Sequence, residues 1–211
     1  MNFEELEEQF KILQEKVRTL EDIEQINILQ RAYGYYVDNM MPDDVADLFT
    51  NDGIFQLGGR VCISQKSIRN YFRKTMFKRP EEGTKKLDLH MQLQGVVNVD
   101  QNGQTAKGRW QYLGFTTDYL GKPPGELQPI LGNGVYENEY VREDGKWKIK
   151  SLMFNGSFSC TLQDGWVKST KIERTYGYLR AEPDKMLDLG DRTWRSGYKV
   201  PCHFKNPVTD K

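Results

Sequence analysis

Four long segments of strand type in the second half of the chain limit the possible folds more than any other feature. The segments are rich in β-branched and aromatic residues. They span residues 89–99, 105–115, 134–142 and 147–154. Asn102-Gly103 follows the first segment and Asp144-Gly145 follows the third, and both pairs are typical of tight turns between antiparallel strands. The sequence therefore predicts two hairpins in one antiparallel sheet.

The first half of the chain has helical periodicity. Apolar residues recur three and four positions apart over residues 3–20 and again over residues 23–36. Pro42 ends the second run, because the residue before a proline disfavours helical geometry. Asp38 is therefore expected at the helix exit. Shorter helices are expected to begin at Pro42 and after Ser64.

Helices followed by an antiparallel sheet indicate an α+β fold, in which a curved sheet wraps around the helices and leaves a cavity between them. We expect three parts: an amphipathic helix over residues 1–20, a central domain over 20–156, and an extension with an arm over 157–211. Glycines and prolines indicate an irregular lid or rim loop over residues 118–133. The apolar stripe of the first helix needs a partner, either the chain's own helices or a second copy, and we favour a second copy.

Composition and motifs exclude several classes of function. The 211 residues include 30 basic and 30 acidic side chains without a block of one sign, so we expect no nucleic-acid partner. The acidic N-terminus and the absence of a run of about 18 apolar residues predict a soluble, cytoplasmic protein without a membrane partner. Three widely spaced cysteines fit neither a disulfide framework nor a zinc site. Nucleotide-binding and zinc-peptidase motifs are missing, so we expect no cofactor and no metal.

Proton-transfer chemistry has few candidates. The chain contains two histidines, and histidine is the side chain whose ordinary pKa, about 6.5, lies closest to working pH. His90 opens the first strand segment, where alternation places it on one face with Gln92 and Gln94. That face is either exposed to solvent or lines a polar pocket, and a surface histidine is the simpler interpretation of the pattern alone. His203 lies in the C-terminal arm and is interpreted as a packing residue.

The stretch RAYGYYVD at residues 31–38 ends the second helical run. Tyr33 and Asp38 are five positions apart, about 140° around an ideal helix, so they face one space only if the helix ends there. A carboxylate at a helix C-terminus is disfavoured by the helix dipole, which indicates another role for it. Tyr35 and Tyr36 are interpreted as packing residues.

These residues, together with several motifs in the same order, resemble the SnoaL-like branch of the nuclear transport factor 2-like superfamily over residues 20–156. The motifs are Asp22-Ile23-Glu24, Leu48-Phe49-x-x-Asp52-Gly53, Leu89-His90-Met91, Thr105-Ala106-Lys107-Gly108-Arg109-Trp110 and Tyr140-x-Arg142-x-Asp144-Gly145-Lys146-Trp147. Within that branch the sequence is most similar to the bile-acid 7α-dehydratase and scytalone dehydratase families. The resemblance implies a cone-shaped, curved antiparallel sheet around N-terminal helices, no cofactor, and a homodimer or homotrimer.

The resemblance also implies a site. The dehydratase pocket uses a tyrosine, an aspartate and a histidine that match Tyr33, Asp38 and His90. Gly114 and Gly156 stand where that pocket has an aspartate and an arginine. We therefore expect a different substrate, with a larger or differently charged ligand in the volume that the two glycines free.

The expected function is that of a cofactor-independent lyase, in which His90 moves a proton, Asp38 orients the imidazole and Tyr33 donates to a developing oxyanion. Loss of water and loss of formaldehyde both fit. An isomerase or cyclase, and a non-catalytic ligand carrier or assembly subunit, are the alternatives. Apolar side chains are expected to border the cavity and to select an apolar, aromatic or polycyclic small molecule, although the same residues fit an ordinary core. They are Met40, Met76, Met91, Trp110, Tyr112, Phe115 and Phe158.

Overall fold

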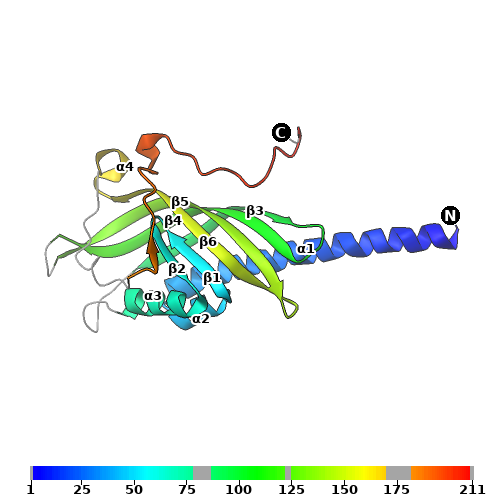
Figure 1. Cartoon of the computed structure of the whole chain (residues 1–211). Helices are drawn as coiled ribbons and strands as arrows, with labels where there is room; N and C mark the ends of the chain where they lie inside the picture. The colour runs from blue at the N-terminus through cyan, green and yellow to red at the C-terminus, as the bar shows by residue number, and fades with distance from the viewer. Residues whose placement is uncertain (1, 78–86, 122–124, 170–181, 210–211) are drawn as a thin grey trace.

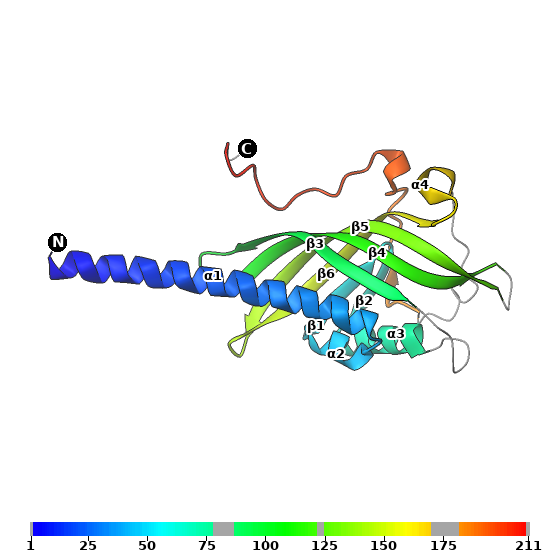
Figure 2. The ribbon, with the colours of Figure 1, turned by 180° about the vertical axis from the view of Figure 1, so that it is seen from behind.

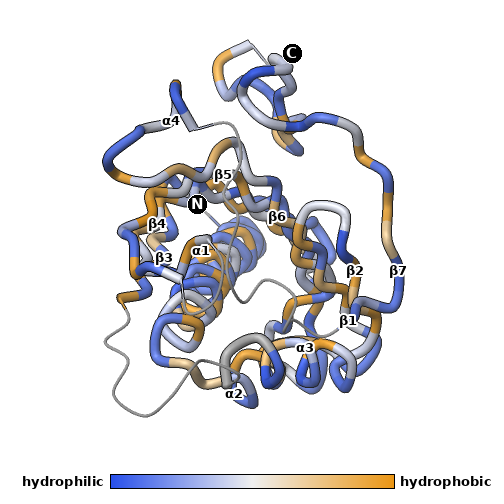
Figure 3. The backbone as a smooth tube through the Cα atoms, turned by 90° about the vertical axis from the view of Figure 1, so that its left-hand side faces the viewer, coloured by the Kyte–Doolittle hydropathy of each residue, from blue (hydrophilic) through white to orange (hydrophobic). Residues whose placement is uncertain are grey.

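A seven-stranded sheet curves around the long helix α1, as Figure 3 shows in a view close to the helix axis. The structure, a computed structural model, describes residues 2–77, 87–121, 125–169 and 182–209, without the side chains of residues 75–77. The helices are α1 (Phe3–Asp38), α2 (Pro42–Asp47), α3 (Gln65–Phe77) and α4 (Gly165–Lys168). The strands are β1 (Phe49–Leu57), β2 (Arg60–Ile63), β3 (Asp88–Val99), β4 (Thr105–Leu120), β5 (Glu126–Glu143), β6 (Lys146–Thr161) and β7 (Lys185–Met186).

The strands lie in the order β3-β4-β5-β6-β1-β2-β7. The two predicted hairpins are confirmed, because β3 pairs with β4 and β5 pairs with β6, both antiparallel. The α+β fold, with a curved sheet around N-terminal helices, is confirmed as well. The sheet departs from the prediction at β1, which pairs with β6 in parallel.

Helix α1 is continuous over 36 residues, so the two helical runs of the sequence form one element. Asn2 caps it: its side chain accepts the backbone N–H of Glu5 at 2.8 Å, and the Glu5 side chain accepts the N–H of Asn2 at 2.9 Å. Asp22 is 2% exposed and accepts a hydrogen bond from Trp147 Nε1 at 3.1 Å, which ties the helix to the sheet. The N-terminal part of α1 projects beyond the sheet (Figures 1 and 2).

Helix α1 ends where the sequence predicts. Asp38 is its last residue, and Met40 takes a left-handed backbone conformation with φ 56°. The N–H of Met41 then donates to the carbonyl of Tyr36 at 2.9 Å. Pro42 begins α2, where a missing N–H costs little because the first helical N–H groups have no partner in the helix. This helix end leaves Asp38 beside β3.

The core lies between α1, the α2–α3 pair and the concave face of the sheet (Figure 2). Burying one large apolar side chain in it contributes about 1.5–3 kcal/mol. Aromatic side chains are numerous, and many pack edge to face. The buried apolar residues are Ile26, Tyr33, Val45, Ala46, Phe49, Phe55, Cys62, Ile68, Tyr71, Phe72, Ala106, Trp110, Tyr112, Tyr136, Tyr140, Trp147, Ile149 and Leu152.

Most of the segment predicted as an irregular lid, residues 118–133, is paired strand. The register of β4 and β5 continues from Thr116↔Ile130 to Leu120↔Glu126. Pro129 fits into β5 because it lies just past the last residue pair of β5 with β6, where the strand needs no N–H donor on that side. Its carbonyl still accepts the N–H of Leu162 at 3.0 Å. The lid prediction is therefore wrong for these strands. Residues 122–124, at the tip, lie outside the described residues.

Strand β6 continues through residue 161. Strand β7 pairs with β2. The predicted arm is irregular apart from a short 3-10 turn at Trp194–Ser196. His203 anchors it: Nδ1 lies 2.8 Å from Glu137 Oε1, and Nε2 lies 3.0 Å from Asn98 Oδ1. No helix in the described part of the chain is both long and apolar enough to cross a membrane.

Candidate active site

Asp38 and His90 form a close pair where the end of α1 meets β3. Asp38 Oδ1 lies 2.7 Å from His90 Nδ1 and also accepts the backbone N–H of His90 at 2.9 Å. The His90 side chain is 22% exposed and the Asp38 side chain 18%, so the pair is largely shielded yet reachable. The structure thus brings together the two groups that the sequence analysis placed in one space.

Close packing of α1 on β3 makes this contact possible. A Cβ atom at Gly34 would lie 3.0 Å from the carbonyl oxygen of His90, closer than nearly all real contacts of this kind. Glycine therefore lets the helix approach the strand. Asp38 lies four residues further along α1, on the same side of the helix, and so meets the histidine.

The carboxylate determines which imidazole nitrogen can act as a base. Asp38 is an acceptor, so it favours the tautomer of His90 that carries its proton on Nδ1. Nε2 then presents a lone pair. Within the described ranges of the chain, no residue forms a hydrogen bond with Nε2. The pair therefore offers one free basic nitrogen and a negative charge that stabilises the imidazolium formed by proton uptake.

Two buried phenols lie close to this pair. The rings of Tyr33 and Tyr136 are 6.0 Å apart, edge to face. Burial, and then the neighbouring Tyr136 phenol, raise the pKa of Tyr33 well above its ordinary value. Burial also raises the pKa of Tyr136, and the Tyr112 phenol and the Asp38 charge add to this. Both phenols therefore keep their protons at neutral pH.

Gln92 links His90 to the core. Its amide Nε2 donates to the carbonyl of His90 at 3.1 Å. Its Oε1 accepts from Gln30 Nε2 at 2.9 Å. Gln30 Oε1 in turn accepts from Asn138 at 2.9 Å and from Tyr140 at 2.8 Å. The site is thus continuous with a buried polar network that fixes α1 against the sheet.

Tyr112 borders the pair and corrects the expectation for Gly114. The Tyr112 and His90 rings are 5.5 Å apart. A Cβ atom at Gly114 would lie 1.7 Å from the Tyr112 hydroxyl oxygen, so that phenol already fills the space beside the glycine. A Cβ atom at Gly156, in contrast, would meet only Phe154, at 3.6 Å. The space beside Gly114 is therefore already filled, whereas a small side chain would fit at Gly156.

Met91 and Phe115 lie on the other face of the sheet from His90. Met91 pairs with Leu113, and strand alternation directs both away from the face that carries His90. Phe115 occupies the same outer face and is 37% exposed. The expectation that these two residues border the cavity is therefore wrong.

Phe158 is displaced by a β-bulge. The register of β5 with β6 shifts between Asn133↔Phe158 and Gly134↔Gly156, so Ser157 is an extra residue. Phe158 consequently shares the outer face with Asn133, and its ring packs 5.6 Å from that of Trp166. It too lies away from His90.

The other expected contacts have mixed positions. Trp110 is a core residue whose ring lies 5.8 Å from that of Tyr140. Met40 is partly buried against the same core, next to the helix end. Tyr112 is the expected contact that the structure places beside the histidine. The side chain of Met76 lies outside the described residues.

Tyr136 was not predicted as a site residue from the sequence. The signal that identifies it is the alternation of Tyr136, Asn138 and Tyr140 along β5, which places all three on one face. The register pairs Tyr136 with Trp110, and that pairing assigns this face to the core.

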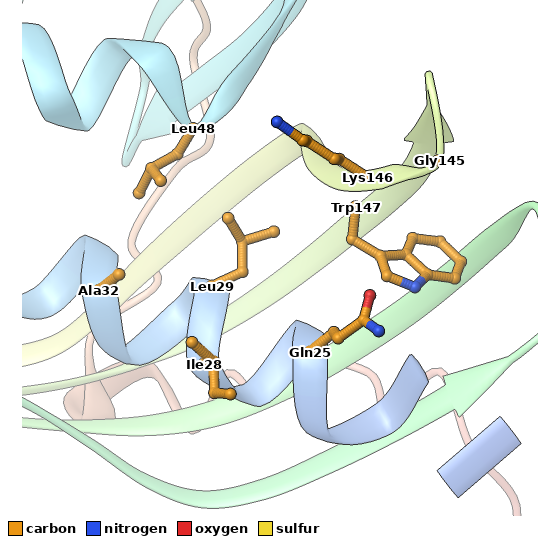
Figure 4. Close-up of a pocket in the computed structure, with 8 residues that line it drawn as sticks. All are labelled: Gln25, Ile28, Leu29, Ala32, Leu48, Gly145, Lys146 and Trp147. Carbon is orange, nitrogen blue, oxygen red and sulfur yellow. The ribbon is translucent and has the colours of Figure 1, made fainter. Parts of the chain in front are cut away.

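A hollow lies on the side of α1 opposite the Asp38–His90 pair. It has a volume of about 280 Å³ and lies between α1, the end of α2 and the turn between β5 and β6 (Figure 4). Its lining residues are Gln25, Ile28, Leu29, Ala32, Leu48, Gly145, Lys146 and Trp147. Of these residues only Lys146 has a titratable side chain, so the lining of this hollow lacks an acid–base pair.

Three solved structures share this architecture. A protein from Novosphingobium aromaticivorans, provisionally described as an aromatic ring hydroxylase, is 25% identical with a TM-score of 0.55, over 69% of this chain and 96% of its own. One from the same organism, provisionally described as a scytalone dehydratase, is 16% identical with a TM-score of 0.58, over 79% and 99%. The hexachlorocyclohexane dehydrochlorinase LinA, type 2, is 19% identical with a TM-score of 0.57, over 70% and 93%. Because the last two proteins are less than 25% identical to this chain, their similarity shows a shared fold and nothing more.

The sequence itself gives the family. No curated protein matches the chain. The model of the SnoaL-like domain family matches residues 18–153, from the middle of α1 to the middle of β6. This range includes Tyr33, Asp38 and His90 and covers more than half of the sequence, so the chain belongs to the SnoaL-like domain family.

Proposed function

We propose that this protein is a cofactor-independent lyase that eliminates water or formaldehyde from a hydroxylated aromatic or polycyclic small molecule. The observation that carries the proposal is the double contact of Asp38 Oδ1 with the Nδ1 and the backbone N–H of His90. That contact orients the imidazole and leaves Nε2 as a base on a partly shielded surface.

In a dehydration, His90 Nε2 takes a proton from a carbon atom of the substrate. The electrons of that C–H bond form the new double bond as the neighbouring C–O bond breaks. The imidazolium, stabilised by Asp38, then gives its proton to the leaving oxygen, so that water departs and His90 returns to its starting state. These reaction steps need one base, His90, and one negative charge beside it, Asp38.

The phenols supply the second part of the mechanism. Burial raises the pKa of Tyr136, so this phenol keeps its proton at neutral pH. In this scheme the Tyr136 hydroxyl group donates to an oxyanion that develops on the substrate. Tyr33 positions Tyr136 by edge-to-face packing, with ring centroids 6.0 Å apart.

An apolar, aromatic substrate is supported by the rings around the pair. Tyr112 lies beside His90, and Phe154 packs 5.2 Å from Tyr112 and 4.8 Å from Tyr136. The room beside Gly156 adjoins Phe154. The provisional description of the 25%-identical relative as an aromatic ring hydroxylase agrees with this substrate class. The structural likeness to a dehydrochlorinase supports an elimination as the reaction class.

An isomerase is the second candidate. The specific observation in its favour is Gly114, which stands where the resembling dehydratases have a further carboxylate. A single base that takes a proton from one carbon and returns it to another is enough to move a double bond.

One experiment separates these functions. The purified protein is incubated with a panel of hydroxylated aromatic and polycyclic compounds, and the masses of the products are measured by mass spectrometry. The proposal predicts a product lighter than its substrate by water or by formaldehyde, and no such product with Asp38→Ala. A product of unchanged mass would replace the lyase by an isomerase. Binding without turnover across the panel would leave a ligand carrier.

A further inference from the structure

The N-terminal part of α1 carries a regular apolar stripe that no described residue of the chain covers. Phe3, Leu6, Phe10, Leu13, Val17 and Leu20 form this stripe, which we call the zipper stripe. These residues are 46–74% exposed. The helix runs free of the sheet over most of this length (Figures 1 and 2). An exposed apolar stripe of this length indicates a helical partner.

The spacing of the zipper stripe is that of a coiled coil. The six residues alternate steps of three and four, which is a strict seven-residue repeat over three heptads. All three d positions, Leu6, Leu13 and Leu20, are leucine, and the a positions are Phe3, Phe10 and Val17. Leucine at d with a β-branched residue at a, here Val17, favours two strands over three or four.

The stripe faces away from the sheet, so a second helix can reach it. Asp22 and Ile26 mark the side of α1 that packs on the sheet, since both are buried. At about 100° per residue, the six stripe residues lie about 100–180° around the helix from Asp22. A partner helix on the stripe would therefore not collide with the sheet of the same chain.

The charges beside the stripe select the direction of the partner. Lys16 occupies a g position and Glu21 the e position of the next heptad, which face each other between the strands of a parallel pair. Neither forms an ion pair with a described residue of its own chain, so both are available. In an antiparallel pair Glu7 would instead face Glu21 of the other strand, and like charges would meet.

We propose that the occupant of the zipper stripe is a second copy of this chain, which forms a parallel two-stranded coiled coil over residues 3–20. The two sheet domains then lie at the same end of the coil. This association is independent of the chemistry proposed for His90.

The first experiment measures the mass of the full chain by sedimentation equilibrium. The wild type is predicted to sediment as two chains. Leu13→Glu places a charge in the seam and is predicted to weaken association by about 100-fold or more, because a buried unpaired charge is costly. The matched control is Ile12→Glu at the neighbouring c position, which is 45% exposed and lies outside the seam.

Three results would overturn the proposal: a monomeric wild type, an assembly of three or more chains, or equal masses for the two glutamate variants. A wild type and an Ile12→Glu variant that both remain two chains, with Leu13→Glu reduced to one, would support it. Circular dichroism of both variants checks that α1 remains helical.

The second experiment tests the direction of the strands. Leu6→Cys is made together with Cys202→Ser, which removes an exposed thiol, and the protein is oxidised. In a parallel coil the two cysteines oppose each other and form a disulfide. In an antiparallel coil with the same stripe, Leu6 would face Val17 of the other strand, and the two cysteines would be about 16 Å apart, too far to join. A dimer that fails to cross-link through residue 6 would contradict the parallel arrangement.

Discussion

The carboxylate oxygen Asp38 Oδ1 contacts His90 twice, at 2.9 Å from the backbone nitrogen and 2.7 Å from Nδ1. The first contact fixes the position of the carboxylate relative to the strand, and the second fixes the tautomer of the ring. A residue at the end of one helix and a residue at the start of one strand thus form a hydrogen-bonded carboxylate–imidazole pair.

Asp38→Asn removes the negative charge but keeps the size of the side chain. The imidazolium of His90 then lacks its counter-charge, so kcat is expected to fall about 100-fold or more on whichever substrate the wild type turns over. Asp44→Asn, at an exposed position of α2, is the matched control and should leave kcat unchanged. Steady-state kinetics of both variants provide the measurement, and near-normal turnover by Asp38→Asn would refute the role of the charge.

Tyr136→Phe removes a single oxygen atom from the site. If Tyr136 donates to the developing oxyanion, kcat should fall by about 100-fold while KM changes little. Tyr35→Phe removes the same atom from a ring that is 68% exposed, and its kinetics should match the wild type. If Tyr136→Phe leaves kcat unchanged, or lowers kcat only as far as it unfolds the protein, the Tyr136 hydroxyl group has a structural role and not a catalytic one.

Gly114→Ala tests the position of the Tyr112 ring. The added methyl group would lie 1.7 Å from the Tyr112 oxygen, so the ring must turn away. The free energy of unfolding is expected to fall by about 1–3 kcal/mol, as for other overpacked sites. Gly156→Ala places its methyl group 3.6 Å from Phe154 and should cost little by comparison. Urea titrations of the two variants give the difference, and equal losses would mean that Tyr112 does not cover Gly114.

The buried phenols predict how stability depends on alkaline pH. The pKa values of Tyr33, Tyr136 and Tyr140 are all raised, with burial as the main cause. Above about pH 10 these groups ionise in the unfolded chain while they stay protonated in the fold. The unfolded chain then binds fewer protons, so the free energy of unfolding falls as pH rises and is unaffected by these groups at lower pH.

Each such phenol contributes about 1.4 kcal/mol per pH unit to this fall. Tyr136→Phe should therefore reduce the slope by about that amount. Urea unfolding of the wild type and the variant at several alkaline pH values provides the test. Identical slopes would show that Tyr136 is not held in its protonated form.

Local features of the sequence were enough to predict the end of α1 and the two hairpins. Pro42 stops the helix because it cannot follow a helical residue easily, and this places Asp38 correctly. Asn-Gly and Asp-Gly turns join strands through their own backbone preferences. These predictions hold because their causes lie within a few residues of the feature.

Long-range pairing decided the features that were predicted wrongly. The glycines and prolines of residues 118–133 are typical of a loop, but continuous pairing of β4 with β5 overrides that local preference. Alternation over Phe154, Gly156 and Phe158 predicts one shared face, and the extra residue Ser157 moves Phe158 to the other face. The place of Tyr136 depends on the register of β5 with β4, which no short motif encodes.

The central claim is that His90 moves the proton in the reaction, and His90→Gln tests it most directly. The measurement is kcat on a substrate found in the panel, with His203→Ala as the control for the histidine in the arm. The account predicts that His90→Gln lowers kcat about 100-fold or more while the unfolding transition is retained, and that His203→Ala keeps most of the activity. Turnover by His90→Gln within a few-fold of the wild type would contradict it.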